Sequence, residues 1–189
     1  MKKLVTAFAA CALAGAVFAQ VESVNVVGYT TTGVKANDYT MFGINFEAVG
    51  GGDIAIQDYF KGDFTGGPGM SEADTLLVWT AATGYVGYYF GYWGDPENPS
   101  WDNKWYNVSD DAETTDVIPA GAACWILRRG AAMDLTVSGQ VKASDSVINI
   151  KANGYTMFSN PFPADVPLNS GIVAANPVGG PGMSEADTL

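Results

Sequence analysis

The chain has 189 residues, a formal net charge of −11 and no histidine. Without histidine it cannot use Ser-His-Asp or Cys-His catalysis, and it cannot bind zinc through histidine. A polyanion of this kind repels nucleic acid and anionic lipid, so we exclude both as main partners.

Residues 1–19 are typical of a bacterial signal peptide. Lys2 and Lys3 precede an apolar run over 4–16 that is too short to span a bilayer, and residues 17–19 form a small-x-small cleavage site. Cleavage there removes both lysines and takes the formal net charge from −11 to −13. Because no later apolar run reaches the length of a membrane helix, we expect a protein without a membrane span, secreted or held at the cell surface.

The two cysteines have different expected fates. Cys11 leaves with the signal peptide, and the residues before it depart from a lipoprotein box at Phe8, so ordinary secretion is preferred to a lipid anchor. Cys124 then stands alone, which excludes an intramolecular disulfide and a cysteine-ligated zinc site. It lies in the apolar strand pattern 122–127, so we expect a small buried hydrophobic side chain.

After residue 19 the chain has the pattern of an all-β protein. Short runs of β-branched and aromatic residues alternate with Gly, Asn, Asp and Pro. The expected strands cover residues 23–29, 39–45, 75–80, 85–93, 104–108, 122–128 and 133–138. One short helix is expected over 54–60, capped by Asp53, and a turn at 82–84 predicts a hairpin over 75–93. Seven or eight strands in such a length predict a β-sandwich or an open barrel.

Two stretches of the sequence occur twice. Residues 66–76 are identical to 179–189, and 35–42 match 151–158 except that Asp38 is replaced by glycine. The spacing predicts a repeated unit of about 115 residues. We therefore expect a complete β repeat domain over 20–141 and a truncated start of a second copy over 142–189, cut from a longer array. In the second copy the expected strands cover 146–151 and 155–160.

The segment 85–93 is the most aromatic part of the chain. As a strand it would place Val86, Tyr88, Phe90 and Tyr92 on a core face, and Tyr85, Tyr89 and Trp93 on the other face with glycines between them. Rings spaced by glycines form a ledge on which sugars can stack. The candidate carbohydrate-binding residues are Tyr85, Tyr89, Trp93, Trp101, Asp102 and Asn103. The alternative is that these aromatic residues serve the core and its edge.

Other polar residues give weaker signals. Asp95, Glu97 and Asp102 could offer oxygen ligands to Ca²⁺, but their spacing does not match a known calcium loop, and a solvated loop is the alternative. The acidic run 110–116 is expected to be a solvated connector. Arg128 and Arg129 could pair with it, and this interpretation is preferred to a substrate clamp because no catalytic partner is visible. No carboxylate pair stands out as a glycosidase motif, and we expect no enzyme, no metal site and no required cofactor.

The chain resembles a group of uncharacterised secreted bacterial tandem-repeat all-β proteins. The resemblance rests on the mature start 23–29, which contains Asn-Val-Val-Gly-Tyr, and on 39–46, 73–79 and 118–125. These are turn and strand signatures, so the resemblance implies a fold and no catalytic residues. In the second copy, 159–162 depart from the corresponding residues of the first, so the two copies are expected to differ locally.

These observations together predict a secreted, non-enzymatic repeat protein with a structural or adhesive role at the cell surface or in the extracellular matrix. Repeating one module raises avidity or builds length without new chemistry. Expected partners are polysaccharide or other surface proteins, and the incomplete second repeat could mediate self-association. The first alternative is a carbohydrate-binding module that uses the aromatic ledge. The second alternative is a fragment of a glycan-active hydrolase.

Overall fold

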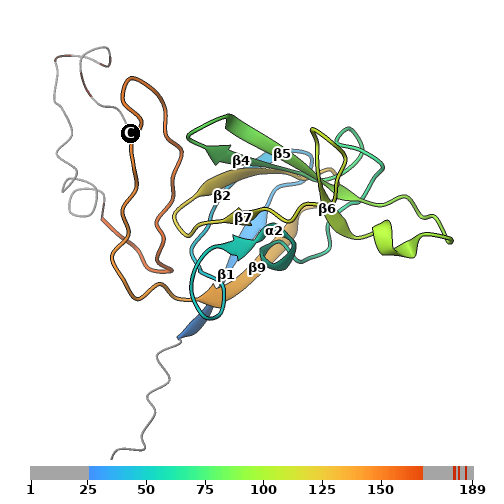
Figure 1. Ribbon diagram of the computed structural model, residues 1–189, viewed down its shortest axis with the longest axis horizontal. Coiled ribbons are helices and arrows are strands. Elements are labelled where there is room, and N and C mark those ends of the chain that lie inside the picture. The colour runs from blue at the N-terminus through green and yellow to red at the C-terminus, as the bar shows by residue number, and fades with distance from the viewer. Residues whose placement is uncertain (1–25, 168–180, 182, 184–185, 187–189) are drawn as a thin grey trace, which may run out of the picture.

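The computed structural model describes residues 26–167 together with 181, 183 and 186 (Figure 1). The predicted signal peptide lies outside the described residues. Within them the strands are β1 (Val27–Val34), β2 (Tyr39–Gly43), β3 (Ile54–Ala55), β4 (Thr75–Thr80), β5 (Gly84–Gly91), β6 (Lys104–Asn107), β7 (Val117–Ile118), β8 (Ala123–Leu127) and β9 (Met133–Gln140). The helices are α2 (Ile56–Tyr59) and a 3₁₀ turn, η1 (Pro99–Trp101). The prediction of an all-β fold with at most one short helix is confirmed.

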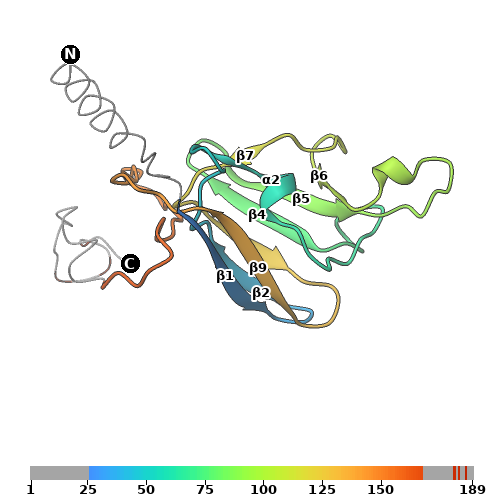
Figure 2. The same cartoon turned by 90° about the horizontal axis from the view of Figure 1, so that it is seen from below.

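The strands form antiparallel open sheets. The largest has five strands in the order β2-β8-β4-β5-β6, while β1 pairs with β9 and β3 with β7. Figure 2 shows the β1–β9 ribbon set at an angle to the five-stranded sheet. In the part of the chain that the structure describes, no sheet closes into a barrel. We call residues 27–141 the first unit.

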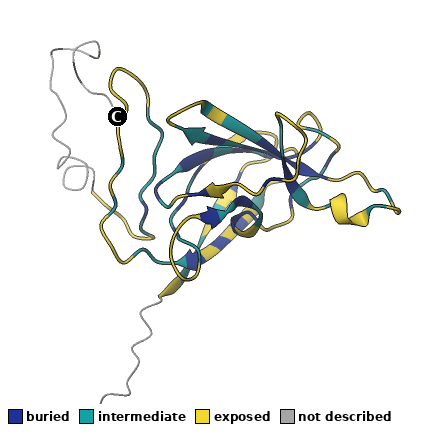
Figure 3. Ribbon diagram, viewed as in Figure 1, coloured by how far each residue is buried: buried dark blue, intermediate teal, exposed yellow. Residues whose placement is uncertain are grey.

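The core lies between the inner face of the five-stranded sheet and the β1–β9 pair. Alternation along the strands sends Leu76 and Ile126 inward from the large sheet, and Leu135 and Val137 inward from β9. Figure 3 shows the buried residues concentrated between these layers. Aromatic rings pack edge to face within this core, as in the Phe64–Trp105 pair at 4.9 Å between centroids. The core therefore combines aromatic rings with aliphatic side chains.

Part of the repeated sequence forms the framework of this unit. Asp74, immediately before β4, is fully buried and forms an ion pair with Arg128. Its carboxylate also accepts the backbone N–H groups of Thr65 at 2.7 Å and Arg129 at 2.6 Å. The expectation that Arg128 pairs with the acidic connector is wrong, because the burial of Asp74 brings its charge inside the unit, where it requires a partner.

Several local predictions need correction. Helix α2 begins at Ile56 with Ala55 as its N-cap, and no side chain caps it, so Asp53 is not the cap. The predicted hairpin is confirmed, with Thr80 opposite Gly84 across the turn. Residues 146–151 and 155–160 form no strands. In the first unit β2 is a strand because β8 pairs with it, and among the described residues no segment pairs with 155–160 in that way.

Candidate functional site

The predicted aromatic ledge is divided by the length of β5. Tyr85 lies near the start of the strand and Trp93 lies just beyond its end, so roughly 26 Å of extended chain separates them. One small ligand cannot contact both residues. The structure instead presents two aromatic surfaces. We call residues 92–103 the tryptophan loop, and we call the outward residues Tyr39, Met41, Leu77, Tyr85 and Trp125 the outer sheet face.

The tryptophan loop carries Trp93 and Trp101 close together. Their ring centroids are 6.4 Å apart with the planes at 77°, and the two residues are 37% and 49% exposed. Figure 3 shows the loop and η1 as exposed chain projecting beyond the sheet. The loop closes where the Asn103 N–H donates to the Gly91 carbonyl at 2.9 Å. The rings are therefore perpendicular neighbours on one loop, and they do not form a flat ledge.

The loop carboxylates shape the loop itself. Asp102 Oδ1 accepts the backbone N–H groups of Trp93 at 2.7 Å and Gly94 at 3.3 Å. Asp95 accepts the Asn98 side-chain amide and a backbone N–H, and these hydrogen bonds, that from Asn98 first, lower the pKa of its carboxyl group. Asp95 and Asp102 thus hold turns within the loop, and they do not converge with Glu97 on one point as calcium ligands would.

The ring of Tyr89 is buried and offers no open face to a sugar. The prediction of Tyr89 as a carbohydrate-stacking residue therefore needs correction. Tyr89 is 2% exposed and stacks on Tyr106 with 5.7 Å between centroids, while its hydroxyl donates to Asp111 at 3.2 Å. Burial first, and then the charge of Asp111, raise the pKa of Tyr89 to about 12. The glycine beside it leaves no open surface, because a Cβ at Gly91 would lie 2.6 Å from the ring of Tyr106. The absence of a side chain at Gly91 makes room for the rings of Trp93 and Tyr106.

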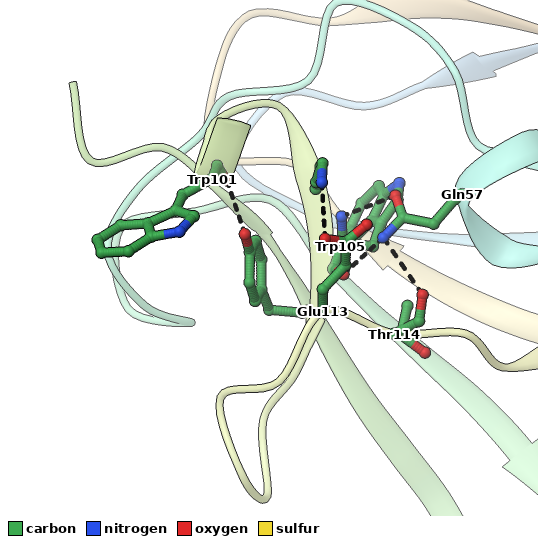
Figure 4. Close-up of polar contacts among 7 residues, drawn as sticks. Gln57, Trp101, Trp105, Glu113 and Thr114 are labelled. Carbon is green, nitrogen blue, oxygen red and sulfur yellow. Dashed lines mark hydrogen bonds and ion pairs between the residues drawn. The ribbon is translucent and has the colours of Figure 1, made fainter. Parts of the chain in front are cut away.

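Polar contacts behind the loop hold its return strand, β6. The Gln57 side chain accepts the Trp105 N–H at 3.0 Å and donates to the Trp105 and Thr114 carbonyls at 2.8 and 3.4 Å. The Tyr106 hydroxyl donates to the Trp101 carbonyl at 2.8 Å. Figure 4 shows that the Trp101 indole points away from this group. Sequence reasoning missed Gln57, because no pattern distinguishes it from an exposed helical glutamine.

The outer sheet face was also missed. Strand register places Met41, Trp125 and Leu77 side by side across three strands. Tyr39 packs edge-on against Trp125 at 6.4 Å between centroids, and Trp125 Nε1 donates to the Tyr85 hydroxyl at 3.1 Å. Tyr39, Met41 and Tyr85 are 46%, 57% and 48% exposed. The order of strands in the sheet brings these residues together, and that order cannot be read from one sequence.

The comparisons give no name to this arrangement. No protein family model, curated protein or solved structure matches the chain. Among the described residues, no helix is long and apolar enough to cross a membrane. In the same part of the chain, no group of three or more Cys, Asp or Glu side chains could hold a metal ion. The two aromatic surfaces and the repeat are therefore the features of the chain that bear on its function.

Proposed function

We propose that the chain is a secreted, non-enzymatic repeat protein with a structural or adhesive role at the cell surface or in the extracellular matrix. The observation that carries the proposal is the structural use of residues 66–76, which occur again at 179–189. Asp74 and Leu76 are fully buried, and the Asp74 carboxylate is satisfied by Arg128 and backbone N–H groups. What the sequence repeats is a scaffold, and repeating a scaffold builds length or avidity.

The outer sheet face supports the adhesive part of the proposal. Exposed apolar side chains gathered on one face favour contact with another surface. Tyr39, Met41 and Tyr85 are about half exposed on this face, whereas the chain as a whole carries a formal charge of −11. The charge keeps the molecule dispersed, while the neutral face allows contact.

A pair of matched variants tests this role. Met41→Thr makes the outer sheet face more polar, whereas Val27→Thr introduces threonine at a similarly exposed apolar residue of β1. Val27 is 59% exposed and Met41 is 57% exposed. We expect the chain in the medium or on the surface of the producing cells, with attachment to cells or matrix lowered by Met41→Thr and unchanged by Val27→Thr. Recovery from the cell interior alone, or equal attachment of both variants, would contradict the adhesive role. Turnover of a glycan panel would contradict the non-enzymatic part.

The tryptophan loop favours carbohydrate binding as a second candidate. Trp93 and Trp101 are exposed at right angles, and a sugar ring can stack on one indole while touching the edge of the other. At the end of the loop, Asn103 lines a depression of about 330 Å³ with Lys61 and Asp63. These groups can accept or donate hydrogen bonds to sugar hydroxyls.

Tryptophan fluorescence tests the sugar site. Soluble polysaccharide should quench or shift the emission of the chain, and Trp101→Ala should abolish the response without unfolding, because its indole points to solvent. Tyr85→Ala, at the far end of β5, is the control and should leave the response unchanged. If polysaccharides give no response, or if both variants respond equally, the loop does not bind sugar.

A further inference from the structure

The start of the second copy packs against the first unit. The Ser159 N–H donates to the Gly121 carbonyl at 2.8 Å, and Ser159 Oγ donates to the Ala122 carbonyl at 2.7 Å. From the first unit, Asn45 Nδ2 donates to the Asn160 carbonyl at 2.7 Å. Pro161 beside them is buried. In both Figure 1 and Figure 2, the chain after β9 lies beside one end of the five-stranded sheet.

A further hydrogen bond links the second copy to Tyr85 of the outer sheet face. The Tyr85 hydroxyl, which accepts from Trp125, donates to Met157 Sδ at 3.5 Å. Tyr85 lies on β5 and pairs with Trp79, whereas Gly43 lies on β2 and pairs with Ala123. Met157 therefore reaches β5 through its side chain, whereas Ser159 lies beside Gly43 of β2. They cover one end of the outer sheet face and leave Met41 exposed.

Gly43 fits this contact closely. A Cβ on Gly43 would lie 2.7 Å from Cβ and 2.9 Å from Oγ of Ser159, closer than packed atoms approach. Its backbone is an ordinary β-strand, so the strand itself does not require glycine at this position. The missing side chain at Gly43 therefore makes room for Ser159.

The docked residues belong to the repeated sequence. Residues 155–158 are Tyr-Thr-Met-Phe, the same as 39–42 of β2. Met157 and Ser159 are two positions apart and share one face of an extended chain. The corresponding Met41 and Gly43 lie on the outward face of β2, and Phe42 between them is in the core. The docked face is thus the outward face of the second copy, and docking leaves Phe158 free to enter a core of its own.

We propose that this contact is the interface between the first unit and the copy that follows it: the Tyr-Thr-Met-Phe segment of the second copy docks on the first unit at the end of the outer sheet face marked by Tyr85 and Gly43. The inference rests on the proposed structural role, and it adds the partner, which is the next copy in the same chain. The second copy carries Ser159 at the position of Gly43, and this residue is itself part of the contact, so the interface joins these two copies as a pair. Docking fixes the orientation of one unit on the next.

Hydrogen exchange on the full chain tests the interface. The Ser159 amide, bonded to Gly121, should be protected, and Gly43→Ala should speed exchange across 157–161 about tenfold while the amides of β4 and β8 stay unchanged. Gly33→Ala is the matched control, since Gly33 is also a strand glycine and the atom nearest to its added Cβ is 3.7 Å away. It should leave exchange of 157–161 unchanged. A second probe, Ser159→Ala, should also speed exchange there.

Two results would overturn the interface. One is an unprotected Ser159 amide in the unchanged chain. The other is equal protection of 157–161 in Gly43→Ala and Gly33→Ala. Either result leaves the structural or adhesive role standing, because that role is tested separately by cell fractionation and by Met41→Thr. Protection that Gly43→Ala removes, in a chain recovered only from the cell interior, would support the interface and contradict the proposed function.

Discussion

Replacing Asp74 with alanine should destabilise the first unit severely. The side chains of Asp74 and Arg128 are 0% and 8% exposed, so the variant leaves a buried guanidinium without a counter-charge. The N–H groups of Thr65 and Arg129 also lose their acceptor. Removing one partner of a buried pair costs about 3–5 kcal/mol. A domain of this size has about 5–15 kcal/mol in total, so the variant is expected near the limit of folding.

Thermal unfolding followed by circular dichroism measures this loss. Asp74→Ala should lower Tm by about 12–20 °C. Asp58→Ala breaks an exposed ion pair with Lys61, whose side chains are 67% and 70% exposed, and should cost less than about 1 kcal/mol. The double variant Asp74→Ala with Arg128→Met should be more stable than Asp74→Ala alone, because it removes the unpaired charge. A loss below about 1 kcal/mol in Asp74→Ala, or no recovery in the double variant, would refute the reasoning.

Further predictions follow from burial. Gly91→Ala should cost about 1–3 kcal/mol in urea unfolding, because the added methyl group meets the rings of Trp93 and Tyr106. Burial raises the pKa of the Cys124 thiol, so a thiol reagent at pH 8 should label it only in denaturant. Burial also raises the pKa of Tyr59 from 10.0 to about 12, and the unfolded chain therefore loses this proton first. Stability measured by urea titration should fall as pH rises through 10 to 12.

The strands that sequence predicted well are those with strong alternation. The run 75–80 matches β4 in full, because apolar residues flank a clear turn and two neighbouring strands pair with it. The predicted start of the helix lies two residues before the observed start, because Ile54 and Ala55 pair with β7 instead. The partner of Arg128 could not be predicted, because Asp74 is 54 positions away in the chain. The sequence around Asp74 is also typical of a turn, which does not indicate a buried charge. Long-range pairing decided each of these differences.

The candidate site shows the same limit. Alternation correctly placed Tyr85 and Tyr89 on one face of β5, but it could not show that Tyr106 of β6 covers Tyr89. Tyr92, predicted for the core, is 50% exposed because β5 ends at Gly91 and the alternation stops there. Period-two patterns assign a residue to a face, whereas strand order decides what lies on that face.

The pairing of β1 with β9 has a mechanical consequence. Val27, where β1 begins, lies opposite Gln140, where β9 ends, so the chain enters and leaves the first unit at neighbouring points. A force that pulls on these two points acts across the ladder and breaks its hydrogen bonds one after another, from this end inward. A force directed along the two strands would instead load all the hydrogen bonds of the ladder at the same time. A tether of such units would lengthen at low force as this pair unzips, and the Asp74–Arg128 pair is not loaded until it has opened.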